Sequence, residues 1–74
     1  MAGSKLLTYC VDGIWRNRVD ERAPLPGEYS SQEEAVENGR SEARIRSLEH
    51  VIFRTDGSVA ARYRYPRLSD EIPG

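Results

Sequence analysis

Two Asp-Gly pairs, Asp12-Gly13 and Asp56-Gly57, constrain the fold of this chain more than any other feature of its sequence. Each pair lies between two short runs rich in β-branched and aromatic residues, which favour extended strands. Asp-Gly readily supplies the positive φ angles that tight hairpin turns require. The sequence therefore predicts two β-hairpins, one on each side of the middle of the chain.

The first predicted hairpin joins residues 5–11 to residues 14–19. A two-residue turn would place Val11 opposite Ile14 and would divide the side chains between two faces, which a one-residue slip would exchange. The face expected to point inward carries Leu6, Thr8, Cys10, Trp15, Asn17 and Val19. The face expected to point to solvent carries Leu7, Tyr9, Val11, Ile14, Arg16 and Arg18.

The second predicted hairpin joins residues 48–54 to residues 58–65, and Pro66 should end its last strand because proline has no N–H for the ladder. The register of this hairpin is open. A two-residue turn would place His50 and Ile52 on one face together with Val59, Ala61 and Tyr63. A three-residue loop with a bulge would place Val51 and Phe53 on that face instead.

One helix is predicted between the hairpins, at residues 31–46. Ser31 and Glu34 fit a capping box, and the acidic first half and basic second half of the segment suit the helix dipole. The stripe expected to face a sheet is made of small residues: Ala35, Val36, Gly39 and Ala43. Glycine inside a helix costs about 1 kcal/mol relative to alanine, so we expect Gly39 to permit a close approach of helix and sheet.

These elements predict an α+β fold of order ββαββ, in which two antiparallel hairpins form a sheet and one helix packs on one face. Residues 5–66 should form this single domain, with residues 1–4 and 67–74 as flexible ends. Residues 20–30 contain Pro24, Pro26 and Gly27 and are predicted to be a loop, with Leu25 or Tyr29 tucked back onto the core.

Composition narrows the functional classes. The chain has 74 residues, of which 38% are hydrophobic, so its core is small and dimerisation would bury more surface. A formal net charge of −1 provides no overall attraction to nucleic acid or to anionic membranes. Cys10 is the only cysteine, and no apolar run approaches the length of a membrane span. We therefore expect a cytoplasmic protein without disulfides.

No catalytic or metal-binding constellation is recognisable. His50 is the only histidine and is expected to be a half-exposed strand residue, while Cys10 is expected to be a buried packing thiol beside Trp15. One histidine and one cysteine cannot supply the three or four ligands that zinc requires. We expect no cofactor, no metal and no enzymatic activity.

Arginine and tyrosine interleave along the strands, and the candidate partner-binding surface is Tyr9, Arg16, Arg18, Arg62 and Arg64. Because interface centres favour tyrosine and arginine, the preferred hypothesis is a protein-interaction or homodimeric self-assembly module. The alternative hypothesis is a nucleic-acid-binding module that uses these arginines and tyrosines. Strict alternation weakens the alternative in the second hairpin, because it places the two arginines opposite Tyr63 and Tyr65.

Several motifs carry a family resemblance across residues 6–66. They are Gly13-Ile14-Trp15, then Ser31, Glu34, Ala35, Val36, Gly39, Arg40 and Ala43 in the helix, then Val51, Ile52, Asp56, Gly57, Val59 and Tyr65 in the second hairpin. With these motifs the chain resembles DUF2188, a family of small bacterial proteins of unknown function. The resemblance implies a bacterial protein with this small fold, and it implies no activity because the family has none assigned.

Overall fold

The computed structural model describes residues 4–65. Its elements are β1 (Lys5–Val11), β2 (Ile14–Val19), α1 (Gln32–Arg46), β3 (Glu49–Phe53) and β4 (Val59–Arg64). This is the predicted ββαββ order. Apart from Ser4, the predicted flexible ends lie outside the described residues, as does Pro66.

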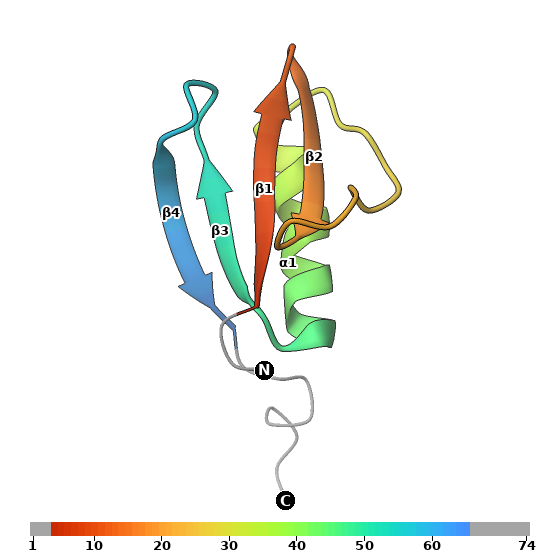
Figure 1. Ribbon diagram of the computed structural model, residues 1–74, viewed down its shortest axis with the longest axis vertical. Helices are drawn as coiled ribbons and strands as arrows, with labels where there is room; N and C mark the ends of the chain where they lie inside the picture. The colour runs from red at the N-terminus through yellow and green to blue at the C-terminus, as the bar shows by residue number, and fades with distance from the viewer. Residues whose placement is uncertain (1–3, 66–74) are drawn as a thin grey trace, which may run out of the picture.

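The four strands form one sheet in the order β2-β1-β3-β4 (Figure 1). Each hairpin is antiparallel, and the two hairpins join through parallel pairing of β1 with β3 at the centre of the sheet. The helix α1 packs on one face of the sheet against β1, β2 and β3. Strand β4 lies at the edge, beyond the strands on which the helix rests (Figure 1).

The first hairpin has the predicted register, from Leu6 opposite Val19 to Val11 opposite Ile14. Both turn residues have positive φ, 52° at Asp12 and 80° at Gly13, as a two-residue turn of this kind requires. The helix-facing side chains of Leu6, Thr8, Trp15, Asn17 and Val19 are buried as predicted. The prediction that Cys10 is buried was wrong: its side chain is half-buried, because the hairpin extends past the end of α1 (Figure 1).

The second hairpin combines features of both predicted alternatives. Arg54 and Ser58 enclose a three-residue loop, in which the Gly57 N–H donates to the Arg54 carbonyl at 3.0 Å. Phe53 then pairs with Val59, but Ile52 pairs with Ala61, so that Ala60 is the extra residue of a bulge. The bulge restores the register, so that Ile52 and His50 face the helix together with Ala61 and Tyr63, as the two-residue turn predicted. Val59 instead shares the opposite face with Phe53, as the three-residue loop predicted.

The helix begins and ends as its capping residues dictate. Ser31 is the N-cap, and its hydroxyl oxygen accepts from the Glu34 N–H at 3.2 Å. At the other end Ser47 adopts a left-handed conformation, and its N–H donates back into the last turn. Ala35, Gly39 and Ala43 form the buried stripe, as predicted, while Val36 is only half-buried.

The loop of residues 20–30 runs back along the outer edge of β2. Trp15 and Tyr29 exchange both backbone hydrogen bonds, at 2.8 and 2.9 Å, and the Leu25 N–H donates to the Asn17 carbonyl at 2.8 Å. Leu25 packs against the core cluster, as predicted. One edge of the sheet is therefore covered. Within residues 4–65 no segment pairs with the outer edge of β4.

Candidate functional site

The sheet face opposite α1, here named the open face, carries the predicted partner-binding surface. Cross-strand partners point to the same side of a sheet. The pairs are Tyr9 with Arg16, Leu7 with Arg18, Val51 with Arg62 and Glu49 with Arg64. All five predicted surface residues therefore lie on the open face, and no described segment packs over it.

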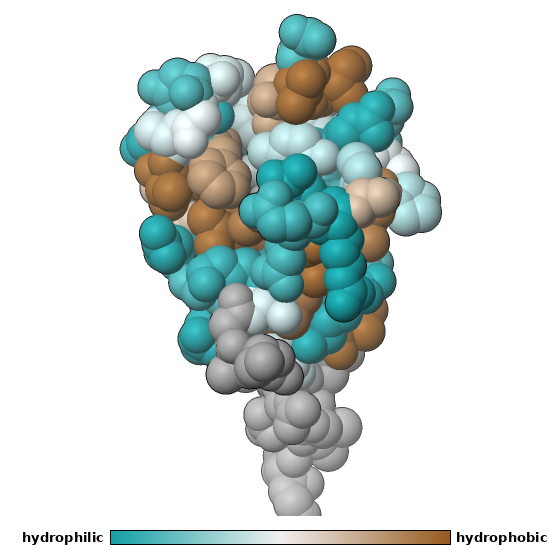
Figure 2. All heavy atoms as spheres, in the orientation of Figure 1, coloured by the Kyte–Doolittle hydropathy of each residue, from teal (hydrophilic) through white to brown (hydrophobic). Residues whose placement is uncertain are grey.

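Cations dominate the strands of the open face. Their register places five cations there, Lys5, Arg16, Arg18, Arg62 and Arg64, and one carboxylate, Glu49. Figure 2 shows this face, with hydrophilic side chains across its middle and hydrophobic groups near the tips of the two hairpins. The excess of positive charge is local, because the whole chain has a formal net charge of −1.

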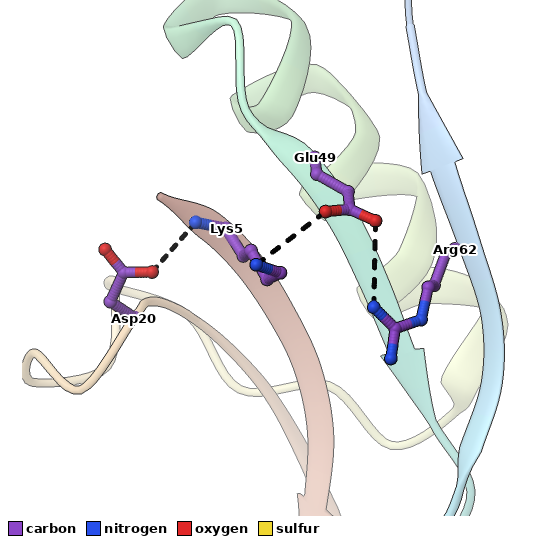
Figure 3. A network of polar contacts seen from close by, with 4 residues as sticks. All are labelled: Lys5, Asp20, Glu49 and Arg62. Atoms are coloured by element: carbon purple, nitrogen blue, oxygen red, sulfur yellow. Dashed lines mark hydrogen bonds and ion pairs between the residues drawn. The ribbon is translucent and has the colours of Figure 1, made fainter. Parts of the chain in front are cut away.

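Glu49 lies between two of these cations (Figure 3). Its carboxylate oxygens are 3.8 Å from the Lys5 ammonium and 3.9 Å from the Arg62 guanidinium. The main-chain N–H of Lys5 donates to Asp20 at 2.8 Å, which ties β1 to the start of the loop. Ion pairs of this length between partly exposed side chains contribute little to stability.

A groove lies between β1 and the β3–β4 turn at the hairpin end of the open face. It has a volume of about 390 Å³ and its lining includes Tyr9, Arg18, Phe53 and Arg54. The Arg18 guanidinium carbon lies 4.9 Å from the centre of the Tyr9 ring, within the range of a cation–π contact. Arg16 forms an ion pair with Glu28 of the loop.

The helix-facing side of the sheet contains a buried chain of polar side chains. Thr8 lies at its centre and hydrogen bonds both to Asn17 and to His50 Nε2, the latter at 2.7 Å. Asn17 Nδ2 donates to the Ala35 carbonyl at 3.0 Å, and His50 Nδ1 is 2.8 Å from the Tyr65 hydroxyl. These hydrogen-bonded side chains, here named the buried polar chain, extend beneath α1 from β2, across β1 and β3, to the residue that follows β4.

The proton positions in this chain follow from its two ends. Because Asn17 donates to Ala35 through its amide nitrogen, its oxygen must accept, and the Thr8 hydroxyl must be the donor. Thr8 has one proton to give, so His50 Nε2 must carry a hydrogen and donate to Thr8. The direction of the last hydrogen bond depends on the charge of His50, because the Tyr65 hydroxyl can either donate or accept. In the neutral imidazole, Nδ1 carries no hydrogen and accepts from Tyr65.

Burial, and to a smaller extent the positive charge of Arg40, lower the pKa of His50 from 6.5 to about 4. The neutral imidazole is therefore the stable form at neutral pH. Burial also raises the pKa of the Tyr65 hydroxyl, against the opposing influence of Arg40. These shifts agree with the proton order, because they hold His50 neutral and Tyr65 protonated.

Gly39 lies directly over the buried polar chain. A Cβ atom at this position would lie 2.7 Å from Asn17 Oδ1, 2.8 Å from His50 Nε2 and 2.9 Å from Thr8 Oγ1. Gly39 therefore permits the close approach that the sequence predicted, and the groups it approaches are three buried polar side chains.

The prediction that His50 is half-exposed was wrong, because its side chain has no exposed surface. A histidine tolerates such burial when both ring nitrogens are hydrogen bonded, and partners from β1 and from residue 65 satisfy them here. The sequence held two signals of the buried polar chain. Polar residues, Thr8 and Asn17, stood on the face predicted to point inward, and a glycine stood in the helix stripe predicted to lie against them.

The described residues contain no cluster of three or more histidine, cysteine, aspartate or glutamate side chains that could hold a metal ion. Among residues 4–65, no helix has the length and apolar character needed to cross a membrane.

Comparison with known proteins identifies one family. A family model described as "Uncharacterized protein conserved in bacteria (DUF2188)" matches residues 9–65, most of the chain. No curated protein and no solved structure matches the chain.

Proposed function

This chain belongs to the DUF2188 family of uncharacterised bacterial proteins. From that premise we propose that it is a non-enzymatic interaction module of the bacterial cytoplasm, which binds a polyanionic partner through its open face. The observation that carries this proposal is the placement of five cations and one carboxylate on the strands of a face that no described segment covers. Complementary charge of this kind guides encounter with a partner and selects it.

The non-enzymatic part of the proposal is supported by the role of His50. Both of its ring nitrogens are engaged by protein side chains, and its side chain has no exposed surface. A general base must reach a proton on its substrate. The His50 imidazole lies beneath the helix with both nitrogens hydrogen bonded to protein side chains, so it has no nitrogen to offer a substrate. The cytoplasmic part is supported by the single thiol of Cys10, since reducing compartments keep such thiols free.

The proposal predicts that the open face determines retention on an immobilised polyanion such as heparin. We expect the double variant Arg62→Gln/Arg64→Gln to elute at clearly lower salt than the wild-type chain, because both arginines are exposed on the open face. The matched control is Arg40→Gln/Arg46→Gln, which changes net charge equally at exposed helix positions. Equal elution of the two double variants would contradict the proposal.

A second candidate function is self-association through the edge of β4, for which the sheet edges supply a specific observation. The loop of residues 20–30 covers the outer edge of β2, whereas within residues 4–65 nothing pairs with the outer edge of β4. Val59 and Tyr63 expose 38% and 50% of their surface on this strand. An uncovered edge strand is a template for pairing with another strand, and the occupant we propose is β4 of a second copy.

This candidate predicts a species of twice the 8.4 kDa chain mass in light scattering at micromolar concentration. We expect Tyr63→Lys to shift the population towards the single chain, since a lysine on an edge strand opposes pairing. Tyr9→Lys, a substitution of the same kind away from this edge, should leave the population unchanged. A wild-type chain that is strictly monomeric at every concentration would eliminate the candidate.

A further inference from the structure

The groove at the hairpin end of the open face places two aromatic rings level with each other. Leu7 of β1 and Val51 of β3 are parallel partners, and Tyr9 and Phe53 each lie two residues further along the same strands. Successive even steps along a strand return to the same face. Both rings therefore point to the open face, on the two central strands, and both line the groove.

Two guanidinium groups accompany these rings. Arg18 lies over Tyr9 at 4.9 Å from the ring centre, and Arg54, whose guanidinium donates to the Val59 carbonyl at 2.8 Å, also lines the groove. Arg18 Nε is buried and has no hydrogen-bond acceptor among the described residues. A buried donor of this kind costs stability until an acceptor reaches it. The groove thus offers flat surfaces for stacking, and it is lined by an arginine whose buried Nε–H has no acceptor among the described residues.

This combination distinguishes between classes of polyanion. Proteins that bind single-stranded nucleic acid stack bases on aromatic rings and guanidinium planes, while basic side chains follow the phosphates. An acidic polypeptide would use the arginines but would have no flat ring system to place between Tyr9 and Phe53. In a double helix the bases are already stacked on one another, so a duplex could not offer one to the groove.

We propose that the groove between Tyr9 and Phe53 takes a base of single-stranded nucleic acid, whose phosphates are held by the arginines of the open face. This inference rests on the proposed polyanion-binding function and names the class of its partner. Arg16 lies beside Tyr9 on β2, and Arg62 and Arg64 extend the cationic surface along β4 away from the β3–β4 turn, where they can follow the nucleic-acid backbone beyond the bound base.

The test measures binding of a fluorescently labelled single-stranded oligonucleotide at low salt, where phosphate contacts are strongest. We expect Tyr9→Leu and Phe53→Leu each to weaken binding about tenfold, because leucine keeps apolar bulk but removes the stacking surface. The matched control is Tyr63→Leu, which removes an exposed ring on the helix-facing side of β4 and should leave oligonucleotide affinity unchanged. Thermal unfolding of each variant shows whether its fold is intact.

The outcomes separate this inference from the function on which it rests. If heparin retention depends on Arg62 and Arg64 but the oligonucleotide does not bind, or binds equally well to both ring variants, the nucleic-acid inference is overturned and the polyanion function stands. Stronger binding of poly-glutamate than of the oligonucleotide has the same meaning and points to an acidic protein. If neither heparin nor the oligonucleotide binds, both proposals fail.

Discussion

Replacing Gly39 with alanine is expected to lower the free energy of unfolding by about 3 kcal/mol, through overpacking and through loss of buried hydrogen bonds. The added Cβ would lie within 2.9 Å of polar atoms on Thr8, Asn17 and His50, all of which are buried. Movement of any one of these side chains leaves a donor or acceptor without its partner. The intrinsic helix preference of alanine over glycine, about 1 kcal/mol, offsets only part of this loss.

Urea unfolding followed by circular dichroism measures this effect. The matched control is Ser41→Ala, a change to the same residue at an exposed position of the same helix, which should leave stability unchanged or slightly raised. In an Asn17→Ala background the nearest clashing atom is absent, so Gly39→Ala should cost less there than in the wild type. A Gly39→Ala chain as stable as the wild type would refute the account of the polar chain.

Acidification from pH 7 to pH 4 is expected to cost about 3 kcal/mol of stability through His50 alone. Its pKa is about 4 in the folded chain, compared with 6.5 for an unperturbed histidine. Between these values the unfolded state binds more protons than the folded state, so stability falls as the pH decreases through this window. The physical cause is burial of the imidazole, which disfavours its charged form.

Urea unfolding across this pH range should show the loss in the wild-type chain and a flatter profile in His50→Gln, where the titrating group is absent. Carboxylates also titrate near the lower end of the range, so the difference between the two profiles is the diagnostic quantity. NMR of the wild-type ring provides a second measurement: its nitrogen shifts should report hydrogen on Nε2 and should stay constant from pH 7 to pH 5. Titration of the ring near pH 6.5 would contradict the proton order.

The features set by local chemistry are predictable from the sequence. Asp12-Gly13 favours a two-residue turn, and that turn alone determines all six pairs of the first hairpin. Ser31 and Glu34 likewise mark the start of α1. The order of the strands in the sheet could not be predicted in this way. The parallel pairing of β1 with β3 joins residues more than forty positions apart, and no short motif encodes it.

The second hairpin shows why its register could not be decided from the sequence. Asp56-Gly57 is compatible with loops of two or three residues, and the chain uses the longer loop and then compensates at Ala60. The small side chain of Ala60 carries no local signal of a bulge. The five predicted surface residues could be assigned to one face only after the β1–β3 pairing was known. That pairing also brings His50 to Thr8 and encloses it, which its own neighbours in sequence do not indicate.

The loop of residues 20–30 has a consequence for the size of any assembly built by strand addition. A sheet can add a strand only at an accessible edge. The backbone of Tyr29 and Leu25 already hydrogen bonds to the backbone N–H and C=O groups that β2 would present to an added strand. Two copies joined through β4 would present a covered β2 at each extremity of the combined sheet. Growth would then stop after a single addition, so this fold can pair without forming filaments.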